Sequence, residues 1–527
     1  MSRPLRKITR PVDDGTPRFW VGAPTRCARS VGRGSRAGAW SPFVAVWGLG
    51  LDSETVKIEF HQPSIDLADS FKAYDVRGIE DQTLNADAAL AVGFAFVEVT
   101  DATRVLVGGD MRPSSEEYVA AFTRGAVAAG ADVEQLGLIS TDMLYHASGV
   151  LDAPGVVFTA SHNPAGYNGM KMTRAAAAPI SSDTGLADIQ RLAQGYLDAG
   201  FLESRERTGE VTHHDTLKAY AQYLRSLVDL SAIRPLKVVV DAGNGMAGYT
   251  TPAVLGGEVL EALPLEIIPL YFELDGTFPN HPANPIEPAN LVDLQAAVRA
   301  HSADIGLAFD GDADRCFVVD ERGASVTPSA ITAMVAIREI ARAKEAGETT
   351  PVIIYNLITS KVVPESVEAA GGRAIETRVG HSFIKAYMAE HSAVFGGEHS
   401  AHYYFRDFFN ADTGMLAAMH VLAMLGATDE SASTLAAAYT PYVASGEINS
   451  QVEDQAATVA RVLAEFDPGV ETHISTMDGT TVRATDGSWW FNIRPSNTEP
   501  LLRFNAEAPD EPTMVWLRDS VLGIIRA

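Results

Sequence analysis

The chain has 527 residues, 46% hydrophobic and 20% charged, with a formal net charge of −26 at pH 7. This composition fits a soluble globular protein of several domains, and the strong negative charge argues against a nucleic-acid partner. Two cysteines are too few for a disulfide scaffold, and no apolar run reaches the 18 residues of a membrane span, so we expect a cytoplasmic protein without a membrane partner.

Residues 1–65 differ from the rest of the chain in composition. The first 50 residues hold nine Lys or Arg and only two acids, and they are rich in glycine. Such a segment has too little apolar content to form a core, so we expect a basic, disordered extension. One hypothesis is that it comes from translation assigned too far upstream, and a targeting peptide is the alternative.

A unit of strand, turn and helix recurs in the next part of the chain. Short β-branched runs at 104–110, 237–243 and 352–356 are typical of buried parallel strands, and residues 115–129 and 329–346 have helical spacing. The pattern predicts three similar α/β domains.

A second apolar strand in each unit ends in a polar loop. These strands are expected at 155–159, 305–309 and 393–396. Open α/β sheets bind ligands beyond the carboxyl ends of their strands, so the three loops are candidate site segments.

The last part of the chain has a different pattern. A helix is expected at 453–466 and strands at 480–485, 489–493 and 501–505, with a fourth polar loop before the last strand. The fold class is therefore α/β, with three similar mixed-sheet α/β domains and a smaller C-terminal α+β domain. The predicted boundaries are 66–210 (domain 1), 211–322 (domain 2), 323–436 (domain 3) and 437–527 (domain 4).

The first loop carries Ser161 between turn-forming residues. His162 beside it could manage protons, and Lys171 could neutralise a phosphate, although a plain turn with an incidental serine has the same composition. The glycines of a G-x-S-x-G hydrolase elbow are absent. An S-x-x-K match at 382–385 has none of its usual companion motifs and is attributed to chance.

The second loop holds three carboxylates at alternate positions, Asp310, Asp312 and Asp314, followed by Arg315. Hard oxygen ligands suit Mg²⁺ or Ca²⁺. An EF-hand would need glycine at the position of Arg315 and helical flanks. A Mg²⁺ site completed by a phosphate is preferred over a solvated acidic turn.

The third and fourth loops are suited to sugar and phosphate. Glu398, Ser400 and His402 alternate and would face one way in an extended loop, where they suit sugar hydroxyls. The fourth loop, 494–498, combines a guanidinium, two hydroxyls and an amide as a phosphate cradle would. Each signal alone is also compatible with an ordinary surface turn.

A G-x-G-x-x-G match at 243–248 follows a predicted strand. Such a turn could bind a dinucleotide with an acidic residue on the ribose, or could serve only as a tight strand-to-helix turn.

Taken in this order, the four loops resemble the α-D-phosphohexomutase family, in its phosphomannomutase/phosphoglucomutase branch. Residues 72–78 also match the family's N-terminal motif, and the resemblance covers about residues 67–527. It implies four domains around one cleft and makes the glycine turn structural. The implied catalytic residues are Ser161 as phosphoserine, His162, Lys171, Arg77 and Arg315. The implied substrate-binding residues are Tyr74, His381, Glu398, Ser400, His402, Arg494, Ser496, Asn497 and Thr498. The implied metal ligands are Asp310, Asp312, Asp314 and an oxygen on Ser161.

The resemblance implies an isomerase that interconverts hexose 1-phosphate and 6-phosphate, with mannose or glucose as the sugar. Mg²⁺ would be its cofactor, and a hexose 1,6-bisphosphate its activator and intermediate. The partner would be a small phosphosugar, and the enzyme a monomer or dimer. Phosphoglucosamine mutase and a Mg²⁺-dependent sugar phosphatase remain alternatives. A family lysine after the first strand of domain 3 is missing; Lys361 would replace it from a shifted position, or its role is lost.

Overall fold

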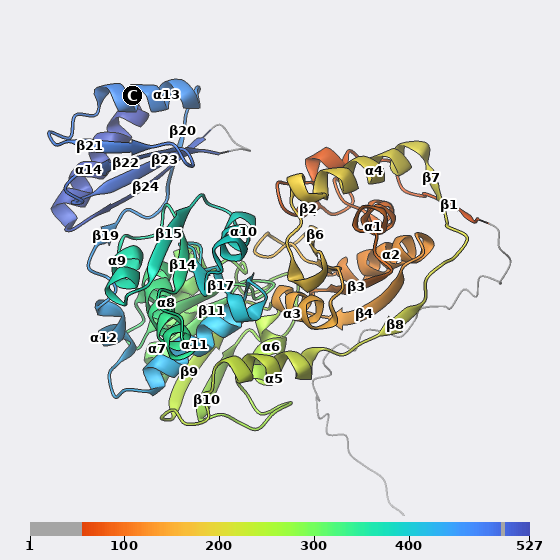
Figure 1. The fold of residues 1–527 in the computed structure, drawn as a ribbon, viewed down its shortest axis with the longest axis horizontal. Helices are drawn as coiled ribbons and strands as arrows, with labels where there is room; N and C mark the ends of the chain where they lie inside the picture. Colours follow the sequence, from red (N-terminus) through yellow and green to blue (C-terminus); the bar gives the residue numbers. More distant parts are fainter. Residues whose placement is uncertain (1–54, 497–500) are drawn as a thin grey trace, which may run out of the picture. The chain divides into compact units, whose positions relative to one another are not determined.

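Three sheets of the protein share one strand arrangement (Figure 1). The computed structural model describes residues 55–496 and 501–527, except the side chains of His381 and Ser382. In each of these sheets a central strand pairs in parallel on one side and antiparallel on the other. The parallel neighbours come from crossover connections through helices, whereas the antiparallel neighbour follows the central strand directly.

The sheet of domain I has the order β2-β6-β5-β3-β4-β8. The crossovers from β3 to β4 and from β4 to β5 run in opposite directions along the sheet, so the usual right-handed connection puts α2 and α3 on opposite faces. Helix α1 packs on both α2 and α4. The strands are β2 (Val76–Ile79), β3 (Arg104–Gly109), β4 (Asp132–Leu138), β5 (Gly155–Phe158), β6 (Tyr167–Thr173) and β8 (Val211–His213). The helices are α1 (Ala86–Thr100), α2 (Ser115–Ala128), α3 (Thr141–Leu151) and α4 (Leu186–Ala199).

Domain II repeats this plan with the order β10-β9-β11-β12-β13. Every residue of β11 is buried, as its unbroken apolar sequence requires. The strands are β9 (Leu236–Asp241), β10 (Leu265–Leu270), β11 (Ile305–Phe309), β12 (Cys316–Asp320) and β13 (Ser325–Val326); the helices are α5 (Leu217–Leu227), α6 (Ala247–Val254) and α7 (Val292–His301).

Domain III repeats it again with the order β15-β14-β16-β17-β18. The strands are β14 (Val352–Asn356), β15 (Arg373–Thr377), β16 (Phe395–Gly397), β17 (Tyr403–Phe405) and β18 (Ala411–Asp412). The helices are α8 (Pro328–Glu345), α9 (Val362–Ala369), α10 (His381–His391), α11 (Gly414–Gly426) and α12 (Ala432–Ala437). The predicted run of three α/β domains is therefore confirmed.

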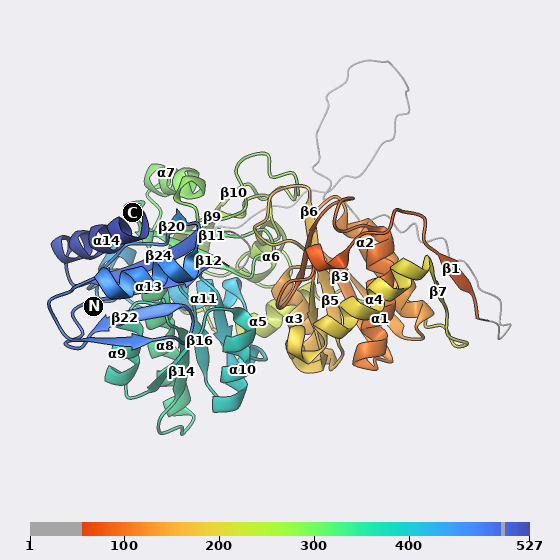
Figure 2. The same ribbon diagram turned by 90° about the horizontal axis from the view of Figure 1, so that it is seen from above.

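Domain IV is the predicted α+β unit. Its sheet order is β19-β24-β23-β22-β21, with β20 also paired to β24, and all its pairs are antiparallel. Figure 2 shows α13 and α14 side by side over this sheet. The elements are β19 (Val443–Ala444), β20 (Ile448–Gln451), β21 (Thr472–Ser475), β22 (Thr480–Ala484), β23 (Trp490–Pro495), β24 (Leu501–Ala508), α13 (Gln455–Glu465) and α14 (Glu511–Ile525).

The buried apolar side chains of the described residues gather in several separate cores. One continuous core includes Leu106 of domain I, Val239 of domain II and Val335 of domain III. Domain IV has its own core around Phe491 and Leu517. Within the described residues, no helix is long and apolar enough to cross a membrane.

Several predicted boundaries need correction. Part of the segment predicted as a disordered extension is structured, because β1 (Lys57–Glu59) pairs antiparallel with β7 (Phe201–Glu203); residues 1–54 lie outside the described part. The predicted ends at 210 and 322 fall before β8 and β13, which complete the sheets of domains I and II. All of these strands have two or three residues and are too short to show the alternation of apolar and polar residues that predicts a strand.

Candidate functional site

Ser161 lies in the loop between β5 and β6, at the carboxyl end of a buried strand. Its backbone is left-handed, with φ of 50°, and its N–H donates to Thr159 Oγ1 at 2.9 Å. A non-glycine residue holds this conformation only where its surroundings enforce it. The loop therefore presents the serine hydroxyl in one fixed direction.

Arg112 supplies much of that enforcement. Its two terminal nitrogens donate to four backbone carbonyls of the serine loop: Ser161 at 2.9 Å, Asn163 at 2.7 Å, Pro164 at 2.9 Å and Tyr167 at 2.8 Å. The side chain is buried, and burial lowers its pKa. Arg112 is not among the predicted site residues, although it follows a buried strand in the same way as the predicted site loops do.

The Ser161 hydroxyl reaches groups from two domains. Its Oγ donates to Asp310 Oδ2 at 2.8 Å, lies 3.2 Å from a terminal nitrogen of Arg315, and lies 3.3 Å from His162 Nδ1. The same Arg315 nitrogen is 2.5 Å from His162 Nδ1, so that ring nitrogen accepts. Burial, together with the neighbouring arginines, lowers the pKa of His162, which keeps the ring neutral near pH 7.

The three predicted aspartates meet in the loop between β11 and β12. Asp310, Asp312 and Asp314 are all buried, and each offers a carboxylate oxygen within 4.8 Å of the others. The Oδ1 atoms of Asp312 and Asp314 are buried and accept no hydrogen bond from the described residues. Converging, unpaired carboxylate oxygens of this kind fit a hard divalent cation.

Two cationic side chains partly neutralise this cluster. Lys171 Nζ lies 2.7 Å from Asp312 Oδ2 and also contacts Asp314, while Arg315 lies 2.7 Å from Asp310 Oδ2. Burial raises the pKa of Asp310 to about 7, with Arg315 opposing and the two other aspartates adding to the rise. Burial acts the same way on Asp312, but the Lys171 ammonium outweighs it and holds the pKa below its usual range. The negative charge is therefore unevenly distributed: Asp312 holds it more firmly than Asp310 does.

Glycines allow the loops of domains I and II to touch. A Cβ on Gly311 would lie 2.4 Å from the Ser161 carbonyl oxygen, and one on Gly245 would lie 2.6 Å from the Gly311 carbonyl oxygen. Met246 N also donates to that Gly311 oxygen at 2.9 Å. The glycine turn at 243–248 therefore supports the aspartate loop, which gives it a structural purpose without a dinucleotide.

The N-terminal motif borders the same loops. Arg77, in β2, donates to Asp75 Oδ2 at 2.8 Å and to Asn163 Oδ1 at 2.7 Å, beside the serine loop. Tyr74 lies near the start of α10, because a Cβ on Gly380 would be 4.0 Å from the Tyr74 ring. Burial and the charge of Asp75 raise the pKa of Tyr74.

The third loop joins the aspartate loop through His402. Arg315 and His402 form an isolated antiparallel bridge, and His402 Nε2 lies 3.8 Å from Asp314 Oδ1. Ser400 Oγ lies 3.1 Å from His402 Nδ1. Glu398 is buried and accepts from Asn356 at 3.1 Å, Tyr404 at 3.0 Å and the Gly380 N–H at 3.3 Å.

The fourth loop is described only in part. Arg494 lies near the end of β23, 3.7 Å from both Glu447 and Asp478, and the Ser496 N–H donates to Leu501 O at 3.0 Å. Asp478 also accepts from the Val379 N–H at 3.0 Å, next to Gly380. The predicted residues Asn497 and Thr498, and the side chain of His381 at the start of α10, lie outside the described part.

Lys361 occupies a different place from the predicted site residues. Its ammonium donates to Gly487 O of domain IV at 2.6 Å and lies 4.1 Å from the centre of the Tyr442 ring. Its backbone N–H donates to Glu507. These contacts give it a role in joining domains III and IV.

Comparison with known proteins agrees with this arrangement. Four phosphoglucomutase/phosphomannomutase family models match in order: alpha/beta/alpha domain I (residues 68–197), alpha/beta/alpha domain II (218–323), alpha/beta/alpha domain III (328–442) and the C-terminal domain (447–523). A phosphomannomutase of Escherichia coli is 38% identical over 460 residues, 86% of this chain and 99% of the relative.

Two further relatives extend the match. The phosphohexose mutases of Xanthomonas campestris are 39% identical over 455 residues, which covers 85% of this chain and 97% of theirs. The crystal structure of a phosphoglucomutase/phosphomannomutase family protein from Burkholderia thailandensis superposes with a TM-score of 0.76 at 30% identity, covering 86% of this chain and 96% of its own. The chain therefore belongs to the phosphoglucomutase/phosphomannomutase family.

Proposed function

We propose that this enzyme interconverts hexose 1-phosphates and hexose 6-phosphates by moving a phosphoryl group to and from Ser161. The observation that carries the proposal is the 2.8 Å hydrogen bond from Ser161 Oγ to Asp310, which joins a fixed hydroxyl of one domain to the carboxylate cluster of another. Phosphoryl transfer depends chiefly on such positioning and on charge neutralisation. Family membership supports the same reaction class.

The aspartate loop fits a divalent cation, which we propose is Mg²⁺. Asp310, Asp312 and Asp314 would hold it, with an oxygen on phosphorylated Ser161 completing the site. When bound, Mg²⁺ would neutralise charge on the phosphoryl group.

The chain's own cations complete the reactive end. Arg315 already contacts both Ser161 Oγ and Asp310, so it can follow the phosphoryl oxygens as the group leaves the serine. Lys171 and Arg77 add positive charge from β6 and β2. Neutral His162 accepts from Arg315 at Nδ1 and so helps to hold that guanidinium beside the Ser161 oxygen.

The sugar and its second phosphate would lie towards the third and fourth loops. Glu398, Ser400 and His402 offer a carboxylate, a hydroxyl and an imidazole for sugar hydroxyls, with Tyr74 and His381 nearby in the predicted set. Arg494 and Ser496 would bind the non-reacting phosphate together with Asn497 and Thr498. Because the bisphosphate must turn round, this cradle has to accept either end of the sugar.

The sugar preference and the setting are part of the proposal. Mannose and glucose phosphates are the proposed substrates, since several relatives are phosphomannomutases. Glucosamine phosphate is the competing substrate, and release of free phosphate would indicate a phosphatase. We also propose a cytoplasmic enzyme that works as a monomer or dimer.

The first test compares native protein with Ser161→Ala. Mannose 1-phosphate, glucose 1-phosphate and glucosamine 1-phosphate are each incubated with Mg²⁺ and a trace of glucose 1,6-bisphosphate. Native protein should form the 6-phosphate without free phosphate, and its mass should show one phosphoryl group after exposure to bisphosphate.

Ser161→Ala should lose both properties, with turnover reduced by at least about 10⁴-fold, because the hydroxyl bonded to Asp310 is gone. Ser148→Ala is the matched control, since Ser148 is a buried serine of the same domain bonded to Ala153 O. A Ser161→Ala protein with normal turnover would falsify the scheme.

A further inference from the structure

We infer that Thr141 is a positioning residue for the aspartate loop, held in place by its neighbour Asp142. The inference rests on the proposed function, because it concerns the cation that the aspartates would bind. Neither residue belongs to the four loops, and neither touches the predicted substrate groups.

Thr141 contacts Asp312 twice. Its Oγ1 donates to Asp312 Oδ2 at 2.6 Å, and its backbone N–H donates to the Asp312 carbonyl oxygen at 3.2 Å. Both residues have zero exposure. A hydroxyl and an amide on one residue therefore fix both the backbone and the carboxylate of a proposed metal ligand.

This contact decides which oxygen of Asp312 is offered to a cation. Oδ2 accepts from Thr141 and from Lys171, whereas Oδ1 is buried and accepts no hydrogen bond from the described residues. With Oδ2 occupied by two donors, the carboxylate cannot rotate without losing both bonds. Oδ1 is then the oxygen left available to a cation.

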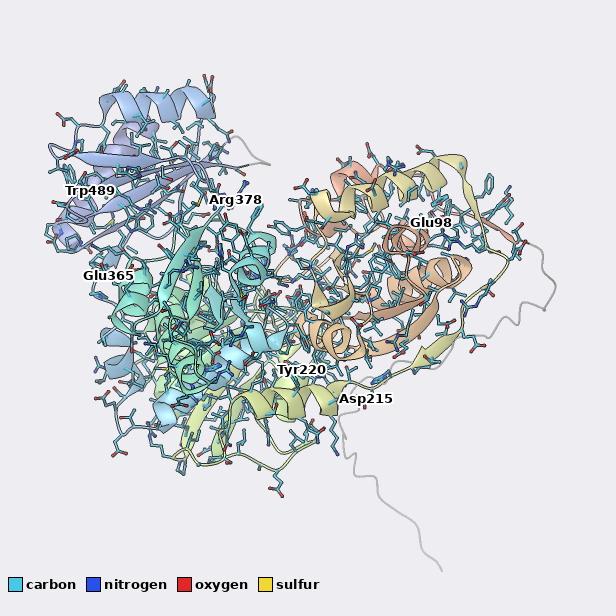
Figure 3. The ribbon with its side chains drawn as sticks, in the orientation of Figure 1. Glu98, Asp215, Tyr220, Glu365, Arg378 and Trp489 are labelled. Atoms are coloured by element: carbon cyan, nitrogen blue, oxygen red, sulfur yellow. The ribbon has the colours of Figure 1, made fainter. Side chains whose placement is uncertain are left out.

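Asp142 anchors the start of α3 to two other domains. Its Oδ2 accepts from Tyr220 Oη at 2.6 Å and from Thr413 Oγ1 at 2.7 Å, and its Oδ1 accepts from Ser140 at 2.5 Å. Tyr220 belongs to α5 of domain II (Figure 3), and Thr413 caps α11 of domain III. The carboxylate thus ties three domains together beside Thr141.

One turn further along α3, Tyr145 makes a third contact from the same helix face. Its ring centre lies 3.8 Å from Lys385 Nζ, and that ammonium lies 2.8 Å from Asp412, next to Thr413. The first turns of α3 are therefore held from several sides, as a precise hydroxyl donor requires. Loss of a partner that orients a metal ligand commonly lowers metal affinity by about 10- to 100-fold.

The test measures metal binding directly in the full chain. Thr141→Val keeps the shape but removes the hydroxyl, whereas Thr141→Ser keeps the hydroxyl. Mg²⁺ binding is measured by calorimetry, and Mn²⁺ binding by electron paramagnetic resonance. Thr141→Val should bind each ion about 10- to 100-fold more weakly, and Thr141→Ser within about threefold of native protein.

Thr123→Val is the matched control. Thr123 is a buried threonine of α2, bonded to Gln135 at 3.2 Å, so its replacement should leave metal affinity unchanged. If Thr141→Val does not fold, Tyr220→Phe is used instead; it removes one anchor of Asp142 and should weaken metal binding several-fold.

The outcomes separate this inference from the proposed function. Native protein that binds neither ion would overturn the proposed metal site, and this inference with it. Native protein that binds, with Thr141→Val and Tyr220→Phe binding equally tightly, would overturn the positioning role alone. Selective loss in Thr141→Val, restored in Thr141→Ser, would support it.

Discussion

The reactive end of the site and the phosphate cradle are built in different ways. Ser161, the three aspartates and His402 are joined by contacts across domains I, II and III, which share one apolar core. Arg494 and Ser496 stand on a hairpin of domain IV, which has a core of its own. Domain IV makes a small apolar contact with domain III, in which Trp490 packs on Leu357 and Ile358.

This difference matches the two tasks that the proposed reaction sets. The serine and its cation must keep one geometry through both transfers, and interlocked domains provide that rigidity. The cradle must accept either end of a bisphosphate, and a domain with a separate core can adjust with less disruption. Substitutions at the two ends should therefore change different kinetic constants.

The largest expected effect in this comparison is at Arg112. Arg112→Lys can satisfy only part of the four carbonyl bonds that fix the serine loop. A displacement of about 1 Å at the reacting hydroxyl costs on the order of 100-fold, so kcat should fall by about that factor while KM changes little. Steady-state kinetics with the favoured hexose 1-phosphate would measure both constants.

Arg225→Lys is the matched control for that variant. Arg225, in α5, also donates to backbone carbonyls, those of Val254 and Gly256 at 2.7 Å and that of Glu261, but in a loop away from the serine. It should lose stability without a selective loss of kcat. Equal loss of kcat in both variants would contradict a specific role for Arg112.

A smaller effect is expected at the cradle. Arg494→Lys replaces a planar fork by a point charge and so loses paired bonds to phosphate. We expect KM to rise about tenfold with kcat within about threefold, since binding is lost equally in ground and transition states. Arg461→Lys, in α13 of the same domain, is the control. A kcat loss as large as that of Arg112→Lys would remove the proposed distinction between the two ends.

The sequence predicted the residues of the site loops better than the residues that hold those loops in place. Ser161 and the aspartates each carry a local pattern, and the structure brings them together because all three repeats place their loop after the central strand. Arg112 and Thr141 act through bonds to residues 49 and 171 positions away, which no local pattern records. Lys361 could not be placed either, because its partners Gly487 and Glu507 belong to domain IV.

The smallest kinetic effect is expected at His146, in the core that the first three domains share. The ring lies on α3 and packs on Tyr220 and Tyr223, and burial lowers the pKa of His146 to about 4. The unfolded chain then binds more protons than the folded chain below pH 6.5. This contribution to stability is fully present above pH 6.5 and is lost as pH falls towards 4.

His146→Leu should therefore keep kcat within about twofold at pH 7.5 but lose less stability on acidification. Between pH 7 and pH 5, the free energy of unfolding of native protein should fall by about 2 kcal/mol more than that of the variant. This follows because pH 5 lies about 1.5 units below the ordinary histidine pKa, at which the unfolded chain is protonated. Urea unfolding at several pH values measures this, with His473→Leu, at an exposed position of β21, as the control. Parallel plots of the free energy of unfolding against pH for native and variant protein would contradict this prediction. They would mean that His146 can take up a proton in the folded chain without disturbing the shared core. That core would then be less rigid than the fixed serine and aspartate loops require.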